Sequence, residues 1–141
     1  MSWFTLQMLI DLVKIIIIGS PIYARIYFFY VRPYRHYFNF RDELTRSGMK
    51  ISHITHNTSL SQLQYDLAFD EISNWLGEIN IIKNKLQFNN LLTRFGIPSN
   101  EELDEAIRCA VFIRNDLGQQ DKIVDTINNY QRLMEIFDIN Q

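Results

Sequence analysis

The strongest constraint on this chain is a nearly continuous run of apolar and aromatic residues from Trp3 to Val31. Only Asp11, Lys14 and Arg25 place charges within it. A helix over the 21 residues from Trp3 to Tyr23 would be about 31 Å long, close to the hydrocarbon thickness of a bilayer. Trp3 and Tyr23 mark its ends, as aromatic residues do at membrane–water interfaces. The sequence therefore predicts a transmembrane or membrane-embedded anchor helix over residues 1–31.

Two other interpretations of this segment stay open. The helix could lie in the membrane interface, with Asp11, Lys14 and Arg25 on its polar face. It could also be the buried core helix of a soluble protein. A secretory signal peptide is not expected, because a basic leader and a cleavage site flanked by small residues are both missing.

Asp11 and Lys14 form a predicted intramembrane charge pair. Each charge costs about 2.5–3.5 kcal/mol near the centre of an inserted helix, whereas each Leu or Ile returns only about 0.3–0.6 kcal/mol, so insertion of the isolated helix is marginal. Residues three apart share a helix face, so the two side chains could neutralise each other. They could also face neighbouring helices, as intramembrane charges usually do. The second explanation predicts partners, either other membrane subunits or copies of this chain.

Aromatic and basic residues alternate over residues 20–41, from the end of the apolar run into a juxtamembrane segment and link predicted over residues 32–58. Aromatic rings favour the headgroup layer and arginine favours anionic lipid. Stacking on single-stranded nucleic acid is the weaker interpretation, because the apolar run adjoins these residues. Pro21 and Pro33 predict breaks or kinks in the helix. The residues expected to bind lipid headgroups are Tyr23, Arg25, Arg32, Tyr34, Arg35 and Tyr37.

The charge of the chain is divided between its two parts. Residues 1–56 carry seven basic and three acidic side chains, whereas residues 57–141 carry seven basic and thirteen acidic ones. The arginines that follow the apolar run place the C-terminal part on the cytoplasmic or matrix side of the membrane. The acceptor motif Asn57-Thr58-Ser59 would then stay unglycosylated.

Residues 59–141 predict a small acidic helical domain. Apolar residues recur every three or four positions over residues 60–77, and the pattern could continue to Leu86. The expected buried face consists of Leu60, Leu63, Leu67, Ala68, Ile72, Trp75 and Leu76. A similar period covers residues 86–95. Ser99 and Glu102 form a capping box that opens a third helix, and a fourth is expected over residues 120–137. A short helix over residues 41–47 is expected to stop at Gly48. The predicted fold class is all-α, an anchor helix followed by a small antiparallel bundle.

No motif for a metal, cofactor or nucleotide appears. His53 and His56 lie in a predicted polar loop and lack further ligands at suitable spacing, so no metal site is expected. The single cysteine, Cys109, falls on the apolar side of its helix and predicts a buried, inert thiol. We therefore expect no cofactor and no enzymatic activity from these patterns.

Arg46 and His53, separated by six residues, are the weak candidates for catalysis. Their spacing resembles the Arg-x(4–6)-His signature of the HEPN ribonucleases, which are all-helical. The resemblance implies that the arginine and histidine of two subunits meet and cleave RNA. Here Ser47 follows the arginine in place of the more usual Asn or Asp, and Gly48 is expected to interrupt the helix that should present both residues.

The leading hypothesis is a non-enzymatic, single-pass membrane subunit or scaffold of a larger complex. Its anchor binds anionic lipids and other subunits, and its helical domain docks a protein partner. One alternative is a membrane-tethered, homo-oligomeric effector, either a HEPN-like ribonuclease or a membrane-perturbing protein. The other is a soluble helical adaptor.

Overall fold

The computed structural model describes residues 3–56, 59–86 and 88–139, and every regular element in these ranges is helical. Asn57 and Thr58 of the acceptor motif lie outside the described residues. The all-α prediction is therefore confirmed for the part of the chain that the structure describes. In chain order the elements are α1 (Trp3–Ile26), η1 (Tyr27–Val31), α2 (Arg32–Thr55), α3 (Gln62–Lys85), η2 (Asn89–Leu91), η3 (Thr93–Phe95), α4 (Asn100–Asp116), η4 (Gln120–Lys122) and α5 (Ile123–Ile136).

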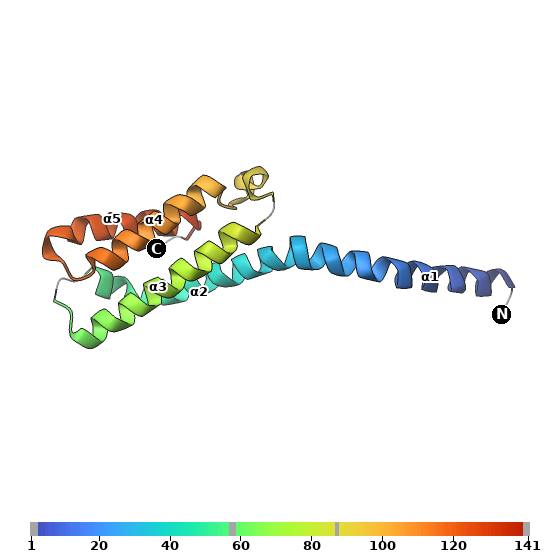
Figure 1. The fold of residues 1–141 in the computed structure, drawn as a ribbon, viewed down its shortest axis with the longest axis horizontal. Coiled ribbons are helices and arrows are strands. Elements are labelled where there is room, and N and C mark those ends of the chain that lie inside the picture. The colour runs from blue at the N-terminus through green and yellow to red at the C-terminus, as the bar shows by residue number, and fades with distance from the viewer. Residues whose placement is uncertain (1–2, 57–58, 87, 140–141) are drawn as a thin grey trace.

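The first three elements form one continuous helix of 53 residues, from Trp3 to Thr55. At 1.5 Å per residue it is about 80 Å long. Its N-terminal part, α1 and η1, projects from the molecule, and we call residues 3–31 the rod (Figure 1). Helix α2 packs in the bundle. By length and composition the continuous helix could cross a membrane.

Of the predicted breaks or kinks, the breaks are wrong, because the helix passes through both Pro21 and Pro33. Pro33 lacks a backbone N–H, and its ring would clash with the carbonyl four residues back in a regular α-helix. The preceding residues instead form η1, a wider π-helical turn in which the Arg32 N–H donates to the Tyr27 carbonyl, five residues earlier. A π turn of this kind accommodates the proline without ending the helix.

Helices α2 to α5 form an antiparallel bundle in which each helix packs against the next (Figure 1). The C-terminal end of α5 also packs against α2. There the Phe137 ring lies 5.5 Å from the Phe40 ring, and Arg41 Nε donates to the Phe137 carbonyl at 2.7 Å. The largest fully buried side chains are those of Tyr37, Leu44, Thr55, Ile72, Trp75, Ile79, Ile82, Leu103, Ile113, Tyr130, Leu133 and Phe137.

Helix α2 does not stop at Gly48, contrary to the prediction, and it continues to Thr55. Gly48 is buried, and its carbonyl accepts a hydrogen bond from the Tyr130 hydroxyl at 2.9 Å. The expected polar loop at His53 is therefore the last turn of this helix.

Helix α3 continues through Gly77 to Lys85, the longer of the two expected extents. The predicted buried face is confirmed for Ile72 and Trp75. It is wrong at the start of the helix, where Leu63 and Leu67 are exposed.

Helix α4 begins as the sequence predicts. The Glu102 N–H donates to Ser99 Oγ at 3.2 Å, and the Ser99 N–H donates to Glu102 Oε1 at 3.3 Å, which completes the capping box. Cys109 is buried on this helix, as predicted, and burial raises the pKa of its thiol. Glu105 accepts two hydrogen bonds from Arg132 of α5, at 2.8 and 2.9 Å, and these hold the pKa of the carboxyl below its usual value.

The helix expected over residues 86–95 is not found among the residues described there, 86 and 88–95. They contain two short 3₁₀ turns, η2 and η3, and Leu91 and Phe95 are exposed instead of buried. Gly96 ends this stretch with a φ of 82°, a left-handed conformation that glycine adopts without a steric penalty.

Candidate membrane interface

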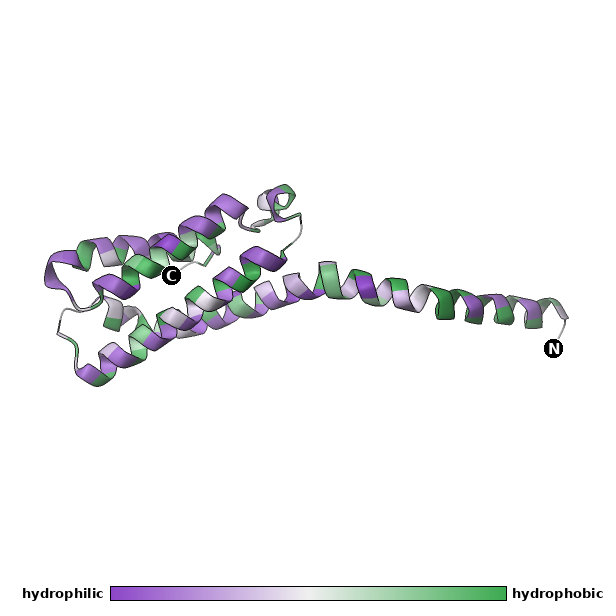
Figure 2. Ribbon diagram, in the orientation of Figure 1, coloured by the Kyte–Doolittle hydropathy of each residue, from purple (hydrophilic) through white to green (hydrophobic). Residues whose placement is uncertain are grey.

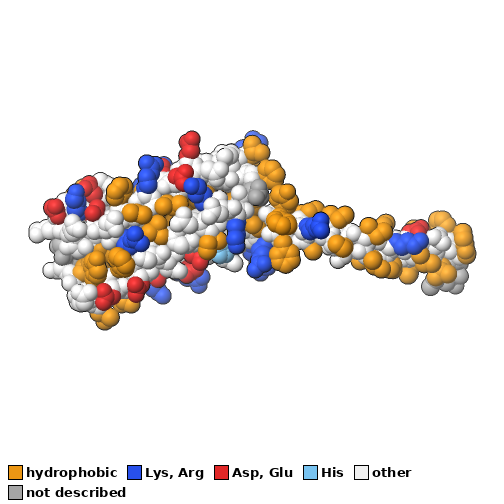
Figure 3. Space-filling view, in the orientation of Figure 1, with side chains coloured by type: hydrophobic (Ala, Val, Ile, Leu, Met, Phe, Trp, Pro, Cys, Tyr) orange, Lys and Arg blue, Asp and Glu red, His pale blue; other side chains and the backbone are white. Residues whose placement is uncertain are grey.

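The projecting helix exposes almost every large apolar side chain it carries. None of the residues of α1 is buried, and exposure reaches 79% at Trp3. Hydrophobic residues recur along the projecting helix (Figure 2), and their side chains cover much of its visible surface (Figure 3). A soluble monomer rarely exposes a contiguous apolar surface of this extent. The exposed large apolar residues are Trp3, Phe4, Leu6, Met8, Leu9, Ile10, Leu12, Val13, Ile15, Ile16, Ile17, Ile18, Ile22, Tyr23, Ile26, Phe28, Phe29, Tyr30 and Val31.

Asp11 and Lys14 lie on α1 with both side chains exposed. The Gln7 amide donates to Asp11 Oδ1 at 3.2 Å, one helical turn away. Within the described residues no ion pair joins Asp11 to Lys14, so the structure does not bring the predicted pair together. Both charges are left facing outward, where groups from other helices would have to neutralise them in a membrane.

Most of the residues expected at the headgroups are exposed along the end of α1 and the start of α2. Tyr23, Arg25, Arg32 and Arg35 all face solvent. The Arg32 guanidinium lies 5.3 Å from the centre of the Phe28 ring, which is cation–π geometry. These side chains form a basic and aromatic collar where the rod meets the bundle.

Tyr34 and Tyr37 lie differently from what the alternating pattern predicts. Tyr34 is half-buried against the core. Tyr37 is only 1% exposed and stacks on Phe137, and burial raises the pKa of its phenol to about 12. The Tyr37 ring is a core side chain, so it is not accessible to lipid headgroups.

A cavity of about 550 Å³ opens between the collar and the C-terminal end of α3. Its apolar wall includes Phe28 and Phe29, and its basic groups are Arg32 and Lys85. His36 also lines it, with Nε2 2.8 Å from Glu78 Oε2. An aromatic wall beside two cations is suited to an anionic group that carries apolar substituents.

The loop that carries η2 and η3 was not predicted from the sequence, which favoured a helix over residues 86–95. The rings of Phe88 and Tyr30 stack 5.8 Å apart, which joins this loop to the rod. The spacing of Leu91 and Phe95 imitates a helical face and predicts burial. The Asn89-Asn90 pair favours turns, and it is the signal in the sequence against a helix over residues 86–95.

Arg46 and His53 both lie on the continuous helix α2 and are both exposed. Residues seven apart on an α-helix share a side and differ by about 10.5 Å along the axis. Arg46 lines a shallow groove with Lys50 and Glu71. Within the described residues no group of three or more His, Cys, Asp or Glu side chains is placed to hold a metal ion.

Comparison of the chain with protein-family models, with curated proteins and with solved structures found no match.

Proposed function

We propose that this chain is a non-enzymatic membrane subunit or scaffold whose α1 helix inserts in a bilayer and whose bundle docks a partner protein. The observation behind the proposal is the apolar rod, none of whose residues is buried. Residues 3–31 would extend about 43 Å as a helix, more than the hydrocarbon core requires. On insertion scales each Leu or Ile of the rod favours the bilayer by about 0.3–0.6 kcal/mol, and together these contributions roughly offset the cost of Asp11 and Lys14.

Membrane fractionation tests insertion. The full-length chain is expected to sediment with membranes, to resist carbonate extraction and to dissolve only in detergent. Replacing Ile15 and Ile17 by Arg is expected to release it, because each charge opposes insertion. Replacing the exposed Leu63 and Leu67 of the bundle by Arg is the matched control. Release of the unaltered chain by carbonate would favour a helix lying in the interface, and recovery as a soluble monomer would contradict the proposal.

The orientation follows from the basic collar, with the bundle on the cytoplasmic or matrix side. A cysteine at exposed Val124, in a Cys109→Ala background, reports it. A membrane-impermeant thiol reagent should label this cysteine only from the cytoplasmic or matrix face. Labelling from the opposite face of sealed vesicles would reverse the topology.

Docking is supported by the acidic character of residues 57–141 and by the absence of a chemical motif. Chemical crosslinking in native membranes, followed by purification in mild detergent and mass spectrometry, tests it. Crosslinks from the bundle to a second polypeptide are expected. Crosslinks confined to copies of this chain would instead favour the homo-oligomeric alternative.

A membrane-tethered ribonuclease of the HEPN kind is the second candidate. One observation favours it: α2 is uninterrupted at Gly48, so Arg46 and His53 lie on the same side of one helix. Purified protein is tested on single-stranded RNA together with Arg46→Ala, His53→Ala and, as a matched control on the same helix, Lys50→Ala. Cleavage abolished by the first two changes and kept by the third would establish this activity, and no cleavage by the unaltered protein would exclude it.

A further inference from the structure

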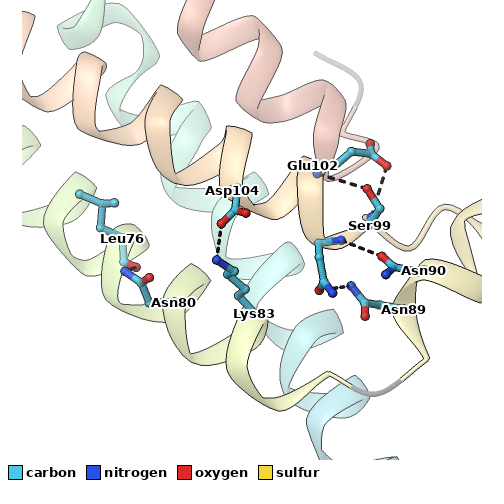
Figure 4. A network of polar contacts seen from close by, with 9 residues as sticks. Leu76, Asn80, Lys83, Asn89, Asn90, Ser99, Glu102 and Asp104 are labelled. Carbon is cyan, nitrogen blue, oxygen red and sulfur yellow. Dashed lines mark hydrogen bonds and ion pairs between the residues drawn. The ribbon is translucent and has the colours of Figure 1, made fainter.

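The loop between α3 and α4 is held firmly although it contains little regular structure. Asn89 is buried, and its side-chain amide donates to the Pro98 carbonyl at 3.1 Å and to Asn100 Oδ1 at 3.0 Å. The Asn100 N–H in turn donates to Asn90 Oδ1 at 2.9 Å (Figure 4). This network ties the loop to the first turn of α4.

The same loop places Phe88 in an unfavourable backbone conformation. Its φ is 61°, in the left-handed region that bulky residues rarely adopt. The network that begins at the next residue, Asn89, keeps the backbone in place. Burial of the Phe88 ring does not explain this strained backbone, because the side chain is 61% exposed.

Three large apolar side chains project from this loop. Leu91 is 74% exposed and Phe95 is 70% exposed, in addition to Phe88. The Arg94 guanidinium lies 5.4 Å from the centre of the Phe95 ring. We define Phe88, Leu91 and Phe95 as the apolar tip of the loop.

The apolar tip lies at the end of the bundle from which the rod projects (Figure 1). The Phe88 ring stacks on Tyr30 of the rod. Hydrophobic side chains continue from the loop onto the rod without interruption (Figure 3). Lys85, which ends α3 just before the loop, shares the junction cavity with Arg32. Apolar groups of the loop and the rod therefore lie next to basic groups of α2 and α3.

We propose that the apolar tip is a second membrane contact, which enters the interfacial layer of the bilayer that holds α1, while Arg32, Lys85 and Arg94 face anionic phospholipid headgroups. This inference rests on the proposed function, because it requires the rod in lipid. A span from Trp3 to Tyr23 places Tyr30 about 10 Å beyond the hydrocarbon core, next to the headgroup layer. Continuity with the rod and the basic residues around the tip favour lipid over a protein partner. The second contact holds the bundle against the membrane surface.

Site-specific fluorescence quenching tests this proposal on the full-length chain. Single cysteines replace Leu91 in the tip, Ile16 in the rod and Val124 at the opposite end of the bundle, each in the Cys109→Ala background. Each cysteine carries an environment-sensitive fluorophore. The protein is reconstituted in phosphatidylcholine vesicles containing phosphatidylglycerol, with nitroxide lipids that quench either at the headgroup or within the acyl chains. Circular dichroism verifies that each labelled protein is folded.

The label at residue 91 is expected to emit at shorter wavelength and to be quenched several-fold more by headgroup nitroxide than the label at residue 124. Quenching at residue 16 by acyl-chain nitroxide, with none at residue 91, would overturn this inference and leave the proposed function standing. Absence of quenching at all three positions would overturn both. Equal quenching at residues 91 and 124 would show that the tip has no special role.

A second comparison separates apolar insertion from general proximity. Phe88→Ser with Phe95→Ser is expected to reduce quenching at residue 91 and to leave quenching at residue 16 unchanged. Removing phosphatidylglycerol is expected to weaken quenching at residue 91 as well, because the basic groups lose their anionic partners. Quenching at residue 91 that survives both changes would contradict the proposal.

Discussion

The hydroxyl of Tyr130 links two helices that are far apart in the chain. It donates to the carbonyl of Gly48, and both residues are buried. The acceptor is already part of α2, so the phenol fixes the position of α5 against the middle of that helix. A hydrogen bond in such a place is costly to lose, because water does not replace the missing partner.

Tyr130→Phe is therefore expected to lower the free energy of unfolding by about 1–2 kcal/mol. Urea unfolding in mild detergent measures the change, with Trp3→Phe as the background so that Trp75 is the single tryptophan. Tyr65→Phe, on a half-buried ring of α3, is the comparison. An effect no larger at Tyr130 than at Tyr65 would contradict the importance of this hydrogen bond.

His56 makes the stability of the bundle depend on pH. Burial lowers the pKa of its imidazole below the ordinary value, and a hydrogen bond with the Ser52 backbone opposes this shift. The folded state then binds fewer protons than the unfolded chain near pH 6.5, so stability is complete above that pH and declines as the pH falls through the unfolded and then the folded pKa. We expect the urea midpoint to fall between pH 7 and pH 5.

His56→Gln is expected to make this decline smaller, because it removes the titrating group. His53→Gln, on the exposed side of the same helix, is the matched control. Identical pH profiles for His56→Gln and the unaltered protein would show that other groups cause the decline.

At the scale of elements, the loop that carries η2 and η3 combines strain with a rigid polar network. Phe88→Gly relieves the left-handed backbone, whereas Phe88→Ala removes the same ring and keeps the strain. We expect Phe88→Gly to be more stable than Phe88→Ala by about 0.5–1 kcal/mol in urea unfolding. The opposite order would mean that flexibility of the unfolded chain outweighs the relief of strain.

The element boundaries also show how far sequence patterns reach. The capping box at Ser99 depends on four consecutive residues and was predicted correctly. Whether Pro33 ends the helix depends on whether the preceding turn can widen. In the structure that turn is a π turn, so the helix continues. The expected stop at Gly48 failed because packing against Tyr130 stabilises the helix at a residue of low intrinsic propensity.

For the whole molecule, we propose that assembly depends on how Asp11 and Lys14 are neutralised. The structure shows no ion pair between them within the described residues, and we propose that charged or polar groups of partner helices face them in a membrane. Replacing both by Leu removes two charges that each oppose insertion by about 2.5–3.5 kcal/mol. Membrane association should therefore persist, while association with partner helices should weaken.

Native gels in mild detergent measure this effect. The double variant is expected to migrate as a smaller species than the unaltered protein, although it still resists carbonate extraction. Ser20→Leu, a polar-to-apolar change at an exposed position of the same helix, is the control. A complex of unchanged size in the double variant would contradict a role for these charges in assembly.

The sequence alone was sufficient for the all-helical class, for the apolar helix of membrane length and for the start of α4. These features follow from composition, hydropathy and hydrogen bonds among residues close together in the chain. Only the tertiary structure decided which aromatic side chains are accessible. Tyr37 is buried because Phe137 of a distant segment packs on it, while Leu91 and Phe95 are exposed on a loop that the sequence pattern presents as a helix with a buried face. Periodicity identifies an apolar face, but contacts between distant segments determine what that face meets.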